Sequence, residues 1–239
     1  MSLRGIRKSF GSIAALRGVD LDLYAGECLG LLGDNAAGKS TLSKVLAGTY
    51  IPDDGTILID GAEVRFATPA EARARRIEMV YQDLSLCDTI DVAGNLFLGR
   101  EIVQHGLLAK RAMTEAARRM LDALEIRIPD LAMRVANLSG GQRQSIAIAR
   151  AASFDPLVLI MDEPTSALAV AEVEAVLALI RRLKAQGRAV VLITHRLQDV
   201  FRVCDRVAVM YEGRMAAERR IEATGLEDLV TLITTGAPR

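Results

Sequence analysis

The sequence of 239 residues has no tryptophan, only two histidines, only three cysteines and no net charge. Its thirty lysines and arginines balance thirty aspartates and glutamates, so no basic excess is present to attract phosphate backbones, and we expect no nucleic-acid partner. Cys28, Cys87 and Cys204 are scattered without metal-ligand spacing. This pattern predicts reduced thiols packed as small apolar groups.

Long hydrophobic runs are also lacking. The longest aliphatic runs, residues 157–161 and 189–193, are strand-sized and far below the roughly 20 residues that a membrane-spanning helix needs. The first residues carry charges without an apolar stretch behind them, so no export signal is expected. We therefore expect a cytoplasmic chain that reaches a membrane only through another protein.

Apolar residues make up 51% of the chain, which is enough to bury the core of one domain with a subdomain. A hairpin is predicted at residues 56–66 around Asp60 and Gly61, paired with strands near residues 3–10 and 19–24. Buried strands are predicted at residues 28–32, 157–161 and 189–194. A helix should follow the first of these strands and stop at Gly48.

Helical periodicity continues in the middle of the chain. It predicts helices over residues 89–100 and 114–124, and a helix capped by Ser139 that runs to residue 152. A hairpin at residues 211–213 and a helix near residues 226–233 close the chain. The whole pattern predicts a single α/β domain over residues 1–239, with an N-terminal antiparallel β subdomain and a helical subdomain inserted at approximately residues 84–155.

Residues 33–41, Gly-Asp-Asn-Ala-Ala-Gly-Lys-Ser-Thr, lie between a predicted strand and a predicted helix. Glycines let several N–H groups converge on a β-phosphate, Lys39 can reach the β- and γ-phosphates, and the Ser40 hydroxyl can ligate Mg²⁺. This phosphate loop predicts a P-loop NTPase core with a mostly parallel sheet, although the loop alone fits kinases, GTPases and many ATPases. Its predicted nucleotide-binding residues are Gly33, Asn35, Ala36, Ala37, Gly38, Lys39, Ser40 and Thr41.

A second glycine-rich turn opens the helix after residue 138. Its sequence, Ser-Gly-Gly-Gln, leaves backbone N–H groups at a helix start, where they attract phosphate. The predicted ligands in this turn are Ser139, Gly140, Gly141 and Gln142. The chain therefore holds two phosphate-binding half-sites that are distant in sequence.

Two acidic residues follow the apolar strand at residues 157–161. Asp162 is predicted to hold Mg²⁺, and Glu163 to act as the general base that accepts a proton from the water attacking the γ-phosphate. His195 follows the strand at residues 189–194 and should reach the same sheet edge, where it would sense the γ-phosphate. His105 lies in a loop-like stretch and is given no role.

Together, residues 33–41, Gln82, residues 138–142, residues 160–164 and His195 resemble the motifs of ATP-binding cassette (ABC) transporter ATPase subunits across nearly the whole chain. The resemblance implies ATP and Mg²⁺ as cofactors, and a head-to-tail homodimer that clasps each ATP between Lys39 of one copy and Ser139 of the other. It also implies that Gln82 links the Mg²⁺ and water site to a transmembrane permease, and that Phe10 stacks on adenine. The subunit would lie on the cytoplasmic face of the membrane.

Residues 81–101 resemble those of monosaccharide importer ATPases of the ribose, xylose and fructose group. This implies import of a small solute with a separate solute-binding protein. A chain that ends soon after one cassette resembles the fructose-importer-like branch, and two such chains would have to pair.

Two positions depart from the family pattern. Ala36 stands where glycine is usual, and would cost about 1 kcal/mol if a positive φ is required there. Ala169 stands where an aspartate commonly reaches across the dimer.

Two other functions stay open at this stage. A soluble ABC protein of translation or DNA repair would usually carry a second cassette or a long coiled-coil insertion. A non-hydrolysing nucleotide-gated scaffold predicts loss of Glu163 or His195, and both residues are present.

Overall fold

A six-stranded sheet forms the centre of the computed structural model, which describes residues 1–237. Its strand order is β12-β11-β3-β10-β9-β6, and every neighbouring pair is parallel except β11 with β12. The strands are β3 (Cys28–Gly33), β6 (Ile77–Val80), β9 (Val158–Asp162), β10 (Ala189–Ile193), β11 (Arg206–Tyr211) and β12 (Arg214–Arg220). Strands β3, β9 and β10 are almost wholly buried, as expected for a parallel sheet that is covered on both faces.

A smaller antiparallel sheet contains the N-terminal strands in the order β2-β1-β4-β5. Its members are β1 (Ser2–Phe10), β2 (Ile13–Asp22), β4 (Asp54–Ile59) and β5 (Ala62–Val64). Asp60 and Gly61, with φ of 50° and 80°, form the turn of the β4–β5 hairpin, because a tight two-residue turn requires positive φ. The predicted hairpin and its pairing with the first strand are confirmed, whereas β2 pairs with β1 and not with the hairpin as predicted.

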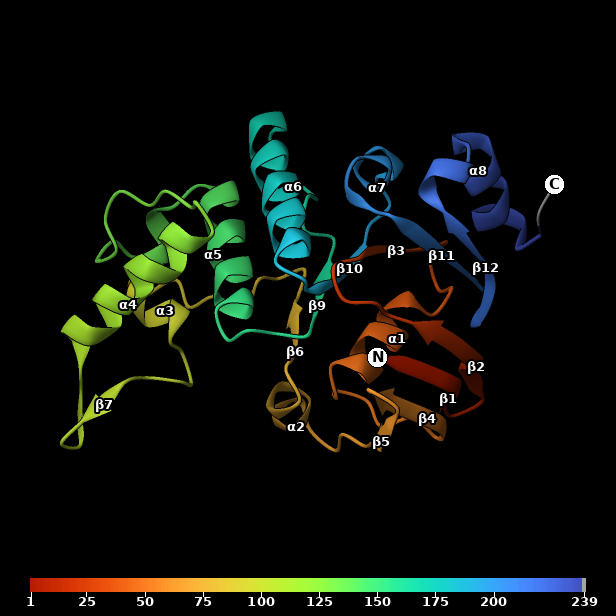
Figure 1. Ribbon diagram of the computed structural model, residues 1–239, viewed down its shortest axis with the longest axis horizontal. Coiled ribbons are helices and arrows are strands. Elements are labelled where there is room, and N and C mark those ends of the chain that lie inside the picture. Colours follow the sequence, from red (N-terminus) through yellow and green to blue (C-terminus); the bar gives the residue numbers. More distant parts are fainter. Residues whose placement is uncertain (238–239) are drawn as a thin grey trace.

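Helices cover the large sheet on both faces (Figure 1). The helices are α1 (Lys39–Leu46), α2 (Pro69–Ala74), α3 (Val92–Leu96), α4 (Lys110–Ala123), α5 (Gly140–Ala152), α6 (Val170–Ala185), α7 (Leu197–Val203) and α8 (Leu226–Thr235). Helices α5 to α8 line one face, whereas α1 and the small sheet lie on the other. Within residues 1–237, no helix is long and apolar enough to span a bilayer.

The helices α3 and α4 and a short hairpin extend beyond α5 at one end of the molecule (Figure 1). The hairpin consists of β7 (Val103–Gln104) and β8 (Leu107–Leu108), and its turn carries His105. All of these elements fall within residues 84–155, the range in which the sequence predicts the helical insertion.

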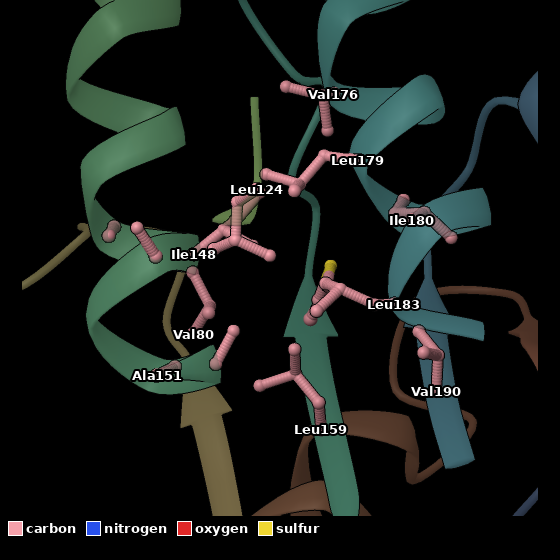
Figure 2. Packing of buried hydrophobic residues seen from close by; sticks show 14 of the residues in the cluster. Val80, Leu124, Ile148, Ala151, Leu159, Val176, Leu179, Ile180, Leu183 and Val190 are labelled. Carbon is pink, nitrogen blue, oxygen red and sulfur yellow. The ribbon is translucent and has the colours of Figure 1, made fainter. Parts of the chain in front are cut away.

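The helices α5 and α6 pack against one face of the large sheet. Leu159 of β9 and Val190 of β10 belong to the same buried cluster as Ile148 of α5 and Leu183 of α6 (Figure 2). Alternate residues such as Ile160 and Val191 pack on the opposite face with α1 and the small sheet. Both faces of each central strand are therefore buried.

Three details differ from the sequence prediction. The helix expected over residues 89–100 is only α3, because Asp91 caps it through the Gly94 N–H at 2.6 Å and Gly99 takes a positive φ of 77° beyond its end. The prediction did not include α6, whose 16 residues form a long helix. Cys28 and Cys204 are buried free thiols with their sulfurs 3.6 Å apart, whereas Cys87 is only partly buried.

Candidate nucleotide-binding site

Four parallel strands, β3, β10, β9 and β6, end side by side at one edge of the large sheet. The register pairs Leu31 with Ile193, Ile193 with Asp162, and Met161 with Val80. The segments after these strands carry the phosphate loop, His195, Glu163 and Gln82. The structure therefore brings these predicted residues to one edge, at the carboxyl ends of the strands where parallel sheets bind ligands.

The phosphate loop takes a conformation that depends on two of its glycines. Gly33 and Gly38 have φ of 149° and 104°. A Cβ at Gly33 would lie 2.4 Å from the Met210 carbonyl oxygen, and one at Gly38 would lie 2.8 Å from that of Ala15. Ala36 also takes a positive φ, 64°, which costs an alanine about 1 kcal/mol. The conformational problem expected at Ala36 is thus present in the folded loop.

Lys39 opens α1 and folds back over the loop. Its Nζ atom donates hydrogen bonds to the carbonyl oxygens of Gly33 at 2.7 Å and Asp34 at 2.9 Å. Burial lowers the pKa of Lys39, and the nearby charges of Glu163, Asp34 and Asp162 oppose this shift. The Lys39 ammonium group is therefore positioned near Asp162 and Glu163, at the edge where a phosphate is expected to bind.

A cleft of about 560 Å³ lies beside the loop. The lining residues are Ile13, Ala14, Ala15, Arg17, residues 35–41, Glu212 and Gly213. The Gly213 N–H donates to the Ala37 carbonyl at 3.1 Å, and the Arg17 N–H donates to the Gly213 carbonyl at 2.8 Å. The β11–β12 turn is thus hydrogen-bonded to the phosphate loop. The sequence prediction did not include this contact.

Phe10, predicted to stack on adenine, is the last residue of β1 and is not among the residues that line the cleft. Its ring packs edge-on against Tyr50 with centroids 5.1 Å apart, and 43% of the residue is exposed. Ile13, on the facing strand, lines the cleft and is 69% exposed. Of these two apolar side chains, only Ile13 borders the cleft beside the loop.

Asp162 is the last residue of β9, and Glu163 follows it. Burial and, to a smaller extent, the charge of Glu163 raise the pKa of Asp162, while Lys44 and Lys39 oppose the shift. Glu163 has a positive φ of 51°, and one of its carboxylate oxygens lies 2.9 Å from Nδ1 of His195. The other oxygen accepts the His195 backbone N–H at 3.1 Å. The structure thus brings the predicted base and the predicted sensor into direct contact.

Gln82 follows β6 and is exposed in a turn next to the end of β9. Its position is compatible with the expected link between the metal site and a partner. No group of three or more His, Cys, Asp or Glu side chains arranged to hold a metal ion occurs within residues 1–237.

The glycine-rich turn at residues 139–142, here called the signature turn, caps α5. Ser139 is the N-cap and accepts the Gln142 N–H at 3.2 Å, while the Gln142 side chain accepts the Ser139 N–H at 2.9 Å. Ser139 and Gly140 are exposed, whereas Gly141 is buried. The turn borders a different hollow from the one at Lys39, so a single chain does not bring the two half-sites together.

Sequence reasoning missed Glu172, which lies in the first turn of α6 and binds the signature turn. Its Oε1 atom accepts hydrogen bonds from the Ser139 hydroxyl and the Gly141 N–H, both at 3.0 Å. The available signal was a glutamate at the third position of a helix, a place where carboxylates cap backbone N–H groups. Without a prediction of α6 that signal could not be used.

The sequence of this chain matches a known protein family and several known proteins. Residues 16–166 match the family model described as ABC transporter. The chain is 43% identical to the xylose/arabinose import ATP-binding protein of Sulfolobus acidocaldarius, over 99% of this chain and 94% of that protein. It is 41% identical to the fructose import ATP-binding protein of Rhizobium meliloti, over 98% of this chain and 93% of that protein.

The fold of this chain is similar to that of a solved structure. A dimeric ATP-binding cassette in a post-hydrolysis state, bound to ADP and Pi, superposes with a TM-score of 0.78 at 25% sequence identity. The superposition covers 93% of this chain and 99% of the other. The predicted α/β P-loop fold is thereby confirmed.

Proposed function

Because this chain belongs to the ABC transporter family, we propose that it is the ATP-hydrolysing subunit of an importer for a small solute, most simply a monosaccharide. The observation that carries the proposal is the sheet edge where Lys39, Asp162 and the Glu163–His195 pair meet. The relatives named for import of xylose or arabinose and of fructose match almost the full chain, which supports a sugar as the solute.

Two copies of the chain would form each nucleotide site. Within one chain, the phosphate loop and the signature turn border different hollows, so one ATP can contact both only if a second copy supplies the turn. In a two-fold arrangement, Lys39 of each copy would face Ser139 of the other, and the two sites would be equivalent. The related cassette that was solved with ADP and Pi is a dimer, which supports this arrangement.

The chain's own residues have separate tasks in hydrolysis. The loop N–H groups and Lys39 would bind the phosphates, and Phe10 would stack on adenine. Glu163 would accept the proton of the attacking water, and its contact with His195 holds the carboxylate in place. ATP binding would close the dimer, and hydrolysis would reopen it.

The residues at the sheet edge also fit Mg²⁺. Ser40, Asp162 and Gln82 would hold the ion with hydroxyl, carboxylate and amide oxygens, the ligand type that Mg²⁺ prefers. The raised pKa of Asp162 reflects a carboxylate that has lost hydration beside Glu163, and a cation would offset both effects. When bound, Mg²⁺ supplies positive charge to the β- and γ-phosphates.

Transport requires partners, which we propose to be transmembrane permease subunits and, through them, a solute-binding protein. The chain would lie at the cytoplasmic face of the membrane, held there by the permease. Gln82, exposed beside the metal site, would pass closure of the dimer to that permease.

Co-expression with its permease tests this function. We expect the chain to co-purify from membranes with a hydrophobic permease, and the reconstituted complex to hydrolyse ATP faster when a particular sugar and its binding protein are added. Xylose, arabinose, ribose and fructose should be compared in the same assay. ATP hydrolysis that never depends on a permease or a solute would instead favour a soluble ABC-type ATPase.

A further inference from the structure

We propose that the Glu172 carboxylate occupies the phosphate-binding position of the signature turn in the nucleotide-free chain, and that it must leave this position before ATP from a second copy can bind. The inference rests on the proposed function, in which the turn receives ATP held by the partner. Glu172 would then compete with the γ-phosphate of that ATP for the signature turn.

The hydrogen bonds of Glu172 carry the argument. Its Oε1 atom accepts from the Ser139 hydroxyl and the Gly141 N–H, the donors expected to bind phosphate, both at 3.0 Å. Each of these groups has a single proton to donate. A carboxylate oxygen and a phosphate oxygen therefore cannot both take them at full strength.

The Glu172 side chain packs closely against the signature turn. A Cβ built on Gly141 would lie 2.6 Å from Cγ of Glu172, so only a glycine lets the glutamate stem cross the turn. The carboxylate lies at the first turns of both α5 and α6, where N–H groups favour a negative charge. Hydrogen bonds from Gly141, Ala169 and Ser139 lower the pKa of Glu172, so the group is an anion at neutral pH.

Glu172 also connects the two half-sites within one chain. Its Oε2 atom accepts the N–H of Ala169 at 3.1 Å, at the end of the segment that begins with Glu163. In the same segment, the Ser166 hydroxyl donates to the Glu163 carbonyl at 2.8 Å. The chain carries Ala169 where the family commonly has aspartate, and Glu172 supplies a carboxylate one helical turn later. Displacement of Glu172 would therefore move residues 163–169 of the same chain. That segment carries Glu163, the proposed base for the ATP that this chain's own phosphate loop binds.

The charge of Glu172 gives the proposal a measurable consequence. A terminal phosphate at Ser139 and Gly141 would face this carboxylate, and like charges repel. Glu172→Gln removes the charge while keeping the size and an acceptor oxygen. The neutral side chain should therefore let the dimer close at a lower ATP concentration.

The experiment uses the full chain in a Glu163→Gln background, in which we expect ATP to be bound and hydrolysed only slowly. Sedimentation velocity gives the ATP concentration that produces half of the dimer for the parent, for Glu172→Gln and for Glu174→Gln. Glu174 is the matched control, because it lies on the same helix and pairs with Arg202 instead of the signature turn. ADP replaces ATP in a parallel series, and nucleotide binding to the monomer is measured separately by fluorescence.

We expect Glu172→Gln to lower the half-dimer ATP concentration about five- to tenfold, with Glu174→Gln unchanged and no dimer in ADP. Glu172→Ala should also lower it. If Glu172 only braces α5 against α6, the alanine variant would instead need more ATP and the glutamine variant would match the parent, which overturns the proposal. It is also overturned if no variant dimerises although all bind ATP. Failure of the parent to bind ATP would reject the proposed function itself, and the inference with it.

Discussion

Nδ1 of His195 lies 2.9 Å from one oxygen of the Glu163 carboxylate, and the backbone N–H of the same histidine donates to the other oxygen at 3.1 Å. One residue therefore orients both oxygens of the proposed base. The Glu163 side chain is only 16% exposed, whereas that of His195 is 74% exposed. The histidine thus connects a sheltered carboxylate to the open edge where a γ-phosphate would arrive.

Glu163→Gln should separate binding from chemistry. Lys39, Ser40 and Ser139 would still bind the phosphates, but no carboxylate would accept the proton of the attacking water. We expect ATP affinity within about twofold of the wild type and hydrolysis slower by roughly 10² or more. Phosphate release under saturating ATP measures the rate, and hydrolysis at the wild-type rate would reject Glu163 as the base.

His195→Ala should slow hydrolysis about tenfold or more, because Glu163 would lose its contact with Nδ1 and keep only the backbone N–H. His105→Ala is the matched control, since His105 is exposed in the β7–β8 turn and should leave the rate unchanged. Steady-state phosphate release compares the two variants. Equal rates for both would mean that the His195 contact has no part in turnover.

Complementation between damaged chains tests the shared site. A Ser139→Arg chain mixed with a Lys39→Ala chain forms heterodimers with one intact site and one doubly damaged site. With random pairing, ATPase activity should return to about a quarter of the wild-type value. A mixture that contains heterodimers, shown by differential tagging, yet stays inactive would contradict the head-to-tail arrangement.

Ala36→Gly should leave ATP affinity unchanged, because the loop already has its strained conformation. Ala36 already has a φ of 64° without nucleotide, so its strain of about 1 kcal/mol is present before ATP binds. Glycine removes this strain but costs about 0.5–1 kcal/mol more entropy on folding. We expect calorimetry to give an unchanged ATP affinity and thermal unfolding to shift little. A tenfold gain in affinity would show that the loop changes conformation on binding.

Asp162→Asn should stabilise the nucleotide-free chain at neutral pH. The pKa of Asp162 is raised by burial and Glu163, so the ionised form is disfavoured in the folded state. This cost is present above the raised pKa and disappears as the pH falls below the ordinary aspartate pKa of about 3.9. Thermal unfolding should show a clearly smaller gain at pH 4 than at pH 8, with exposed Asp60→Asn as the control. A gain that does not depend on pH would reject the electrostatic explanation.

Most of the nucleotide site could be predicted from sequence because its determinants are short and local. The phosphate loop, the acidic pair after β9 and the Ser139 cap each depend on residues that are adjacent in the chain. The contact of Glu172 with Ser139 and that of Gly213 with Ala37 join distant segments. No local pattern encodes such contacts, because they arise only when the helices and sheets pack. The length of α3 was overestimated because its apolar periodicity extends past its true ends, which the Asp91 cap and the positive φ of Gly99 set.

The position of β3 in the large sheet has a consequence for biosynthesis. This strand delivers the phosphate loop, yet its two neighbours, β10 and β11, lie near the C-terminal end of the chain. During translation, β3 therefore emerges from the ribosome long before either strand with which it pairs. Pairing between such distant segments is slow, and an unpaired apolar strand is prone to aggregate. A nascent chain in which Arg206 has not yet been added should thus depend on chaperones. This dependence should end once β11 has been made.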